Sequence, residues 1–224
     1  MAQPLSRAAI LRIAPFALFM LLLALRGALP ADGALDPRWV YAWTVVLVGG
    51  VLLWFGREYG EFAAQLLPDA RETLLAIAVG VVVFVLWIQL DAPWMRLGEA
   101  TASFRPVDAQ GALQWPLIAV RWVGAALLVP VMEELFWRSF LMRWIESPQF
   151  ETVVPQRVGA KAIVLSTFVF MLAHTLWLAA IIAGLAYAWL YVRSGKLWLP
   201  VIAHAVTNGV LGVWVVVTGN WGYW

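Results

Sequence analysis

The stretch WVGAALLVPVMEELFWRSF, residues 122–140, carries three charged side chains inside a long apolar run. A helix that crosses a bilayer needs about 20 predominantly apolar residues, and this run approaches that length. Charged side chains at membrane depth are costly unless they pair with each other or face a polar cavity. The stretch therefore predicts a membrane helix that turns Glu133, Glu134 and Arg138 towards the interior of a helix bundle.

The composition of the chain excludes most soluble classes of protein. Of its 224 residues, 63% are hydrophobic and only 12% are charged, and the mean hydropathy is +0.84. A soluble domain of this size cannot bury that much apolar surface, so we expect an all-α polytopic protein embedded in a lipid bilayer. No basic stripe indicates a nucleic-acid partner. The chain has no cysteine, which excludes disulfides, thiolate catalysis and cysteine-ligated zinc.

Seven apolar segments are long enough to be read as membrane helices. We expect a bundle of about seven to eight transmembrane helices, in which the fourth segment continues as helix to about Ile145. The boundary between the fifth and sixth segments, near His174, stays open. The segments are 8–26, 38–56, 73–90, 113–132, 159–174, 176–193 and 197–217.

The arginine and lysine residues indicate an orientation in the membrane. With a cytoplasmic N-terminus and seven spans, ten of them fall on the cytoplasmic side and five on the other. We therefore expect the N-terminus to lie in the cytoplasm. The short seven-helix form with many tryptophans and arginines favours a bacterial inner-membrane protein. We interpret Arg121, on the other side, as an interfacial residue that extends towards the headgroups. The five are Arg26, Arg38, Arg96, Arg105 and Arg121.

The first apolar segment has a second interpretation, a signal peptide that is removed. Basic, apolar and small residues follow one another there in the order that such a peptide has. The apolar part is long for a signal peptide, however, and Arg26 lies where the small-residue cleavage site should begin. We expect an uncleaved first helix.

Two adjacent carboxylates in the opening stretch have different expected environments. On a helix, Glu134 and Arg138 are one turn apart, in the order that favours an ion pair. Glu133 lies about 100° away around the helix and has no such partner, so it must face a cavity or another helix. Pro130 cannot donate a hydrogen bond to the carbonyl of Ala126, which predicts a kink that makes room.

Three more polar side chains occur in the apolar segments that follow. The chain has only two histidines, His174 and His204, and Asn208 is one helical turn after His204. A helix bundle can bring these three side chains together with Glu133 at one interior site. Taken singly, each histidine is more often a packing residue, and Asn208 could simply tie helices together. Their joint occurrence with an unpaired glutamate favours a site.

Three motifs carry a resemblance to a known family. EELFWR, residues 133–138, matches EExxxR; FMLAH, residues 170–174, matches FxxxH; and HAVTN, residues 204–208, matches HxxxN. In this order they resemble the CPBP family of intramembrane glutamic endopeptidases, which includes the type II CAAX prenyl endopeptidases and the bacterial Abi proteins. The similarity covers roughly residues 113–217.

The resemblance implies a division of the chain and an activity. Residues 112–224 would form a CAAX-protease-like catalytic core, and residues 1–111 would hold transmembrane helices 1–3 and the polar loop 91–111. The core would hydrolyse a peptide bond of a membrane-associated protein or peptide. The catalytic residues implied are Glu133 and His174, which activate a water, and His204 and Asn208, which stabilise the oxyanion.

The resemblance also implies supporting residues and a cofactor requirement. Glu134, Arg138 and Phe170 would hold the catalytic side chains in place without touching the substrate. No metal or other cofactor is expected. The partners are the bilayer and a membrane-associated substrate, and nothing in the sequence sets an oligomeric state.

Other functions stay open on the residues alone. Two histidines and a glutamate could ligate zinc in an intramembrane metalloprotease, although the chain has no HExxH motif. Buried Glu, His and Arg also mark ion paths in proton-coupled transporters, but the chain is short and shows no inverted repeat. A third alternative is a non-catalytic membrane scaffold that binds the tail of a partner.

Overall fold

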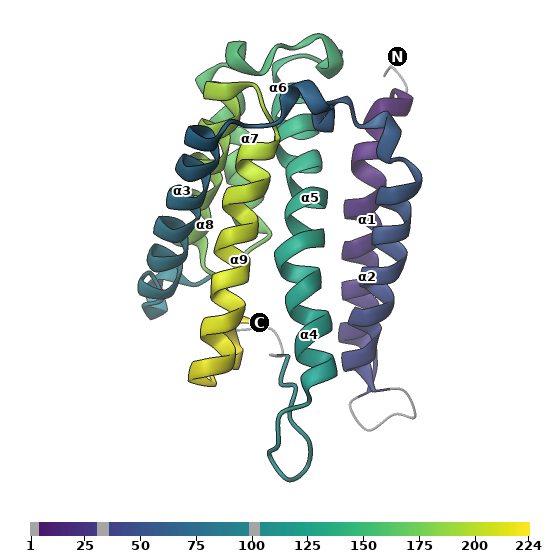
Figure 1. The fold of residues 1–224 in the computed structure, drawn as a ribbon, viewed down its shortest axis with the longest axis vertical. Helices are drawn as coiled ribbons and strands as arrows, with labels where there is room; N and C mark the ends of the chain where they lie inside the picture. The colour runs from purple at the N-terminus through teal and green to yellow at the C-terminus, as the bar shows by residue number, and fades with distance from the viewer. Residues whose placement is uncertain (1–4, 31–35, 99–103) are drawn as a thin grey trace.

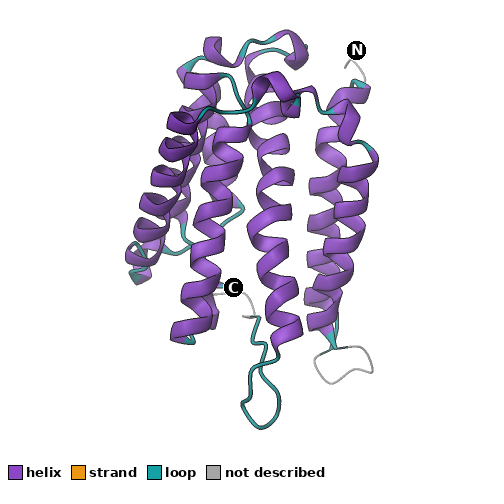
Figure 2. Cartoon of the chain, viewed as in Figure 1, coloured by secondary structure: helices purple, strands orange, loops and turns teal. Residues whose placement is uncertain are grey.

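The computed structural model describes residues 5–30, 36–98 and 104–224. Within these ranges the regular elements are helices, joined by loops with two isolated β-bridges (Figures 1 and 2). Short 3-10 turns lie in the connections. The long elements are α1 (Arg7–Ala28), α2 (Pro37–Trp54), α3 (Ala70–Gln89), a continuous helix Trp115–Glu146, α7 (Ala160–Leu172), α8 (Trp177–Ser194) and α9 (Trp198–Thr218). The 3-10 turns are Gly56–Glu58, Gly60–Phe62, Ala64–Leu66, Pro93–Met95, Phe150–Thr152, Pro155–Arg157 and Trp221–Tyr223.

Six of these helices are long and apolar enough to cross a membrane. The seventh, α7, has 13 residues, or about 20 Å of helix, and is too short to span the hydrocarbon core of about 30 Å. The prediction of a polytopic helical membrane bundle is confirmed. All seven predicted segments are helical, and the boundary left open near His174 is the non-helical connection 173–176.

Two sequence-based predictions extend beyond the described residues. Residues 99–103 of the polar loop 91–111 are not described, and neither are residues 31–35, which follow the proposed first helix. Arg26, where the alternative cleavage site would begin, lies inside α1, which continues to Ala28.

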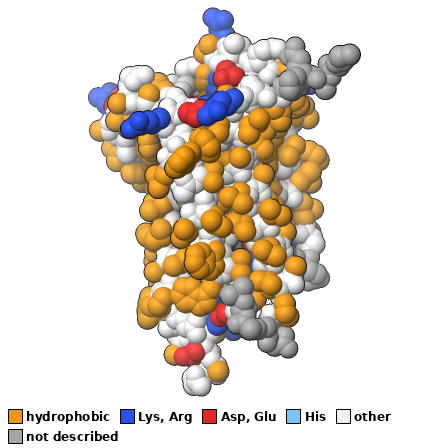
Figure 3. Space-filling model, turned by 90° about the vertical axis from the view of Figure 1, so that its right-hand side faces the viewer, with side chains coloured by type: hydrophobic (Ala, Val, Ile, Leu, Met, Phe, Trp, Pro, Cys, Tyr) orange, Lys and Arg blue, Asp and Glu red, His pale blue; other side chains and the backbone are white. Residues whose placement is uncertain are grey.

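The surface of the bundle matches a lipid environment. Hydrophobic side chains cover the middle of the face shown in Figure 3, and charged side chains gather towards its two ends. Leu53 and Trp54 at the end of α2 are 84% and 83% exposed, and many other large apolar residues are also exposed. An exposed apolar surface of this size is unfavourable in water and favourable in contact with the hydrocarbon core of a bilayer.

The continuous helix Trp115–Glu146 runs through the centre of the view in Figure 1 and is not regular along its length. It starts as α4 (Trp115–Val123), widens into the π-helical turn η5 (Gly124–Leu128), returns to α5 (Val129–Glu134), widens again in η6 (Leu135–Met142) and ends as α6 (Arg143–Glu146). A kink was predicted at Pro130; the irregularity that the structure shows is the π-turn η5, which ends at Leu128, two residues before it. Pro130 removes one donor from the helix, which favours such a change.

A buried ionic cluster anchors the η6 end of this helix. Arg12 of α1 donates to both carboxylate oxygens of Glu61, at 2.8 and 2.7 Å, and Ser139 of η6 also donates to Glu61. Arg143 adds its charge at 3.8 Å. Burial alone would raise the pKa of Glu61, but the hydrogen bonds from Arg12 and Ser139 hold it below its usual range. The cluster ties α1 and the connection after α2 to the central helix.

Helices α3 and α9 pack closely because position 80 is glycine. A Cβ built on Gly80 would lie 2.4 Å from the carbonyl oxygen of Ala203 and 2.9 Å from Cβ of Val206. The hydroxyl of Thr207 lies 2.8 Å from the carbonyl oxygen of Gly80 and can donate to it. This contact fixes the part of α9 that carries His204 and Asn208.

We expect Gly80→Ala to destabilise the bundle, because the backbone of α9 cannot yield easily to the new methyl group. The free energy of unfolding should fall by at least about 1–3 kcal/mol, the usual cost of overpacking. This fall should appear as a lower unfolding midpoint in detergent. Gly50→Ala in α2 is the matched control, since a Cβ there has nothing within 4 Å. Equal midpoints for the two variants would show that the α3–α9 contact is not tight.

Candidate active site

One interior cavity of about 270 Å³ collects the four residues predicted to be catalytic. Glu133 comes from α5, His174 from the connection after α7, and His204 and Asn208 from α9. Side chains of α1, α3 and α8 complete the wall, so the first helix and the third contribute to the site as well. Four polar groups that are far apart in the sequence thus face one space inside the bundle.

Glu133 is half-buried on the cavity wall. The indole N–H of Trp137, one turn later on the same helix, lies 3.3 Å from its Oε2 and donates to it. Glu133 therefore has a hydrogen-bond partner in its own helix that was not predicted. It has no ion-pair partner among the described residues, and its charge is close enough to act on the ring of His174.

His174 lies just beyond the end of α7 with a defined ring orientation. Its Nδ1 is 2.8 Å from the carbonyl oxygen of Phe170. A carbonyl can only accept, so Nδ1 carries the proton and Nε2 of the neutral ring keeps a lone pair. The ring of Phe170 lies 4.3 Å from that of His174, centre to centre, and Trp87 meets it edge-on at 5.7 Å. Phe170 thus contacts His174 through both backbone and ring.

Glu134 joins two partners, one from its own helix and one from α9. It is fully buried, and its Oε1 accepts from Nη1 of Arg138 at 3.0 Å, as the spacing predicted. The same oxygen lies 2.9 Å from Nδ1 of His204. Because the carboxylate accepts, the proton of His204 is on Nδ1. The contact with His204 crosses between helices and was not predicted.

The aromatic surroundings of this triad fix its orientation. The guanidinium of Arg138 lies over the rings of Phe170 and Tyr187, at 4.7 and 5.4 Å. The ring of His204 stacks on Tyr187 at 5.1 Å. The hydroxyl of Tyr187 donates to Oγ1 of Thr207, which is on α9 as well. Arg138 and His204 are therefore each held by Glu134 and by an aromatic face.

Asn208 spans the gap between α9 and the π-turn η5. Its amide nitrogen donates to the carbonyl oxygen of Ala125 at 2.9 Å. Trp122 makes a second cross-link nearby, from its indole N–H to the carbonyl oxygen of Gly209 at 2.9 Å. An amide nitrogen has two N–H groups, so one remains to face the cavity. The widened turn thus supplies the acceptor that orients Asn208.

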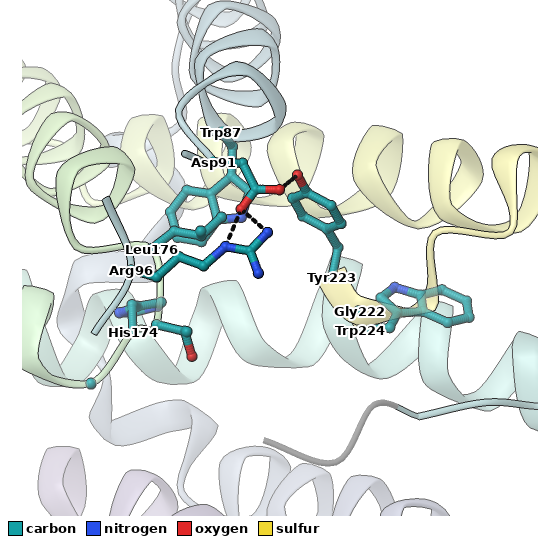
Figure 4. A pocket seen from close by; sticks show the side chains of 10 residues that line it. Trp87, Asp91, Arg96, His174, Leu176, Gly222, Tyr223 and Trp224 are labelled. Carbon is teal, nitrogen blue, oxygen red and sulfur yellow. Dashed lines mark hydrogen bonds and ion pairs between the residues drawn. The ribbon is translucent and has the colours of Figure 1, made fainter. Parts of the chain in front are cut away.

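A second cavity of about 290 Å³, here called the outer cavity, adjoins the first, the inner cavity. The two share Trp87, His174, Tyr223 and Trp224. The outer cavity holds only one of the four predicted catalytic residues. On the wall of this second cavity, Asp91 accepts hydrogen bonds from Arg96 and from the hydroxyl of Tyr223, as Figure 4 shows. Burial and then the bond to Asp91 raise the pKa of Tyr223, so its phenol stays protonated and donates.

Arg121 lines the inner cavity, which sequence reasoning missed. It was predicted only as an interfacial residue, and the structure adds a place on the cavity wall. On a regular α-helix, positions 121 and 133 are about 120° apart around the axis, so periodicity did not connect them. The π-turn between them changes this phase.

Within the described part of the chain, no three His, Cys, Asp or Glu side chains are grouped closely enough to hold a metal ion. The donor set considered for zinc, Glu133 with the two histidines, is therefore not assembled as a ligand cluster in this arrangement. The two histidines direct Nδ1 to Phe170 and Glu134, which leaves their Nε2 atoms for the cavity.

Comparison with known proteins finds a family for the core of the chain. Residues 115–210 match the family model described as type II CAAX prenyl endopeptidase Rce1-like. The match starts with the central helix and ends in α9, and it includes all three motifs. The predicted resemblance is confirmed over these residues, and it implies a membrane protease. No curated protein and no solved structure matches the chain.

Removing the carboxylate of Glu134 should destabilise the fold. Glu134→Ala would leave the guanidinium of Arg138 buried without its counter-charge, which typically costs about 3–5 kcal/mol. We expect a much lower unfolding midpoint in detergent, measured by circular dichroism. Glu58→Ala is the control, because the Arg7–Glu58 pair is exposed and should change the midpoint little. A similar midpoint for both variants would contradict a structural role for Glu134.

Proposed function

We propose that this protein is an intramembrane endopeptidase in which Glu133 and His174 activate water and His204 and Asn208 stabilise the oxyanion. The observation that carries the proposal is the convergence of these four side chains on one cavity. The family match, which covers all four positions, supports peptide-bond hydrolysis as the reaction. The substrate would be a membrane-associated protein or peptide.

Activation of water would be shared by Glu133 and His174. The carboxylate of Glu133 has no counter-charge among the described residues, so it can accept a proton from a water in the cavity. The unprotonated Nε2 of His174 can accept a second hydrogen bond from that water and orient it. As the water oxygen attacks the carbonyl carbon, its proton passes to Glu133, which then delivers it to the leaving amine.

Stabilisation of the oxyanion would fall to His204 and Asn208. The Nδ1–H of His204 is already given to Glu134, so the ring donates to an oxyanion only if Nε2 is protonated too. The free N–H of Asn208, one turn later on α9, supplies a second donor. Glu134 is then a positioning residue that acts on the reaction through His204.

The charge count supports an orientation of the enzyme, and its short, helical, tryptophan-rich form supports a bacterial membrane. We propose a bacterial inner-membrane protein with a cytoplasmic N-terminus. The connection 90–98 and the C-terminal residues 222–224, which border the outer cavity, would then lie at the non-cytoplasmic end. In this orientation a substrate would enter from that side of the bundle.

The test of the mechanism is cleavage of a quenched fluorescent peptide library by the protein in nanodiscs. We expect Glu133→Gln to lower the rate at least about a hundredfold, because the amide cannot take a proton from water. The variant should unfold at the wild-type midpoint. Glu58→Gln, an exposed carboxylate, is the control and should cleave like the wild type.

The same assay discriminates a zinc enzyme. Activity that is unchanged by a chelator and lost in Glu133→Gln supports the glutamate mechanism. Activity removed by the chelator and restored by zinc would replace it with the metalloprotease. Full activity of Glu133→Gln would overturn the assignment of the base.

Asn208→Ala should reduce kcat by roughly 100- to 1000-fold while KM changes little, because the oxyanion donor acts in the transition state only. The measurement is steady-state cleavage of the best peptide from the library. Asn220→Ala, at the exposed end of α9, is the matched control. A rise in KM alone would assign Asn208 to substrate binding instead of oxyanion stabilisation.

A further inference from the structure

Two arginines meet at one side of the inner cavity without a carboxylate partner. The guanidinium of Arg121 lies 4.5 Å from the ring centre of Tyr41 and 5.8 Å from that of Phe104. The guanidinium of Arg26, from α1, lies over the same Phe104 ring at 5.2 Å. Neither arginine has a hydrogen-bond or ion-pair partner among the described residues. Arg121 is the one that lines the cavity.

The polar atoms at this place are incompletely satisfied. Nε of Arg121 is buried and has no hydrogen-bond partner in the described part of the chain, and the hydroxyl of Tyr41 is in the same state. Buried donors are normally paired, because an unpaired one costs its full desolvation. Two like charges over one aromatic ring add repulsion. The site therefore favours an anion that accepts from Arg121.

Two other arginines on this side of the bundle are already paired. Arg38 pairs with Asp36 at 2.7 Å, and Arg96 pairs with Asp91 at 2.6 Å. Arg105 is exposed to solvent. Arg26 and Arg121 thus differ from their neighbours in being partly enclosed and unpaired. A planar guanidinium binds a carboxylate through two parallel hydrogen bonds, which makes a carboxylate the fitting anion.

We propose that Arg121, with Arg26 behind it, binds a carboxylate of the substrate peptide and so sets where the peptide is cut. This inference rests on the proposed function, since the cavity must hold a peptide. The twelve positions from Arg121 to Glu133 correspond to about 18 Å along a helix. An extended peptide covers that distance in about five residues. The carboxylate therefore lies about five residues from the scissile bond, as an acidic side chain or as the C-terminal group.

Direct binding tests the proposal independently of cleavage. Labelled peptides of about ten residues, each with one aspartate moved along an otherwise neutral sequence, are titrated onto the protein in phosphatidylcholine nanodiscs. One set has a free C-terminus and the other an amide. We expect one aspartate position, or the free C-terminus, to tighten binding roughly tenfold or more, as a charged hydrogen bond would. Comparison of the two sets identifies which carboxylate is bound.

Variants assign the preference to the arginine. Arg121→Gln should remove the tenfold advantage, and Arg121→Lys, which keeps the charge but not the paired donors, should retain part of it. Arg105→Gln, at the same end of the bundle, should leave it unchanged. For a cleaved peptide, Arg121→Gln should raise KM and change kcat little.

Three results would overturn the proposal. The first is equal affinity for acidic and neutral peptides in the wild type. The second is an acidic preference that survives in Arg121→Gln. The third is loss of the preference when phosphatidylglycerol replaces phosphatidylcholine, which would assign the arginine to a net-anionic lipid. Absence of cleavage with an intact Arg121-dependent preference would refute the proposed function alone.

Discussion

The buried carboxylate of Glu134 is the constraint on which the site depends. It has no exposure to solvent, and one oxygen serves both Arg138 and His204. Burying these charges is favourable only if each finds its partner with good geometry, so the pairing fixes the rotation of the central helix against α9. Once that rotation is fixed, Glu133 can face only the cavity. The two adjacent glutamates thus have separate tasks, one in the fold and one at the proposed reaction centre.

The π-turns of the central helix adapt it to this arrangement. In a regular helix, the carbonyl of Ala125 would accept a hydrogen bond from the backbone of the same helix. In this π-turn it also accepts one from the side chain of Asn208 on α9. The η6 segment carries Arg138 and also Ser139, which bonds to Glu61 in the anchoring cluster. Departures from regular helix therefore occur where side chains from other helices must be received.

The helices were predictable because length and hydropathy decide which segments enter a bilayer. The Glu134–Arg138 pair was predictable from its spacing. The Trp137–Glu133 bond has the same spacing and was predictable in principle. The motifs named Glu133, His174, His204 and Asn208, yet their convergence depends on packing between helices that no local pattern encodes. The Glu134–His204 contact was not predictable for the same reason. The place of Arg121 on the cavity wall was not predictable because a π-turn changes the angle around the helix axis between Arg121 and Glu133.

The short length of α7 has a consequence for the supply of water. The helix ends at Leu172, and the chain leaves helical geometry at His174, within the depth that longer helices cross. Irregular backbone at that depth must be shielded from lipid or lie beside a water-filled space, and here it borders the outer cavity with Asp91 and Arg96. Hydrolysis consumes one water per bond in an environment that excludes it. In the mechanism proposed above, the missing turns of α7 would give that water a polar route to Nε2 of His174 without a passage through hydrocarbon.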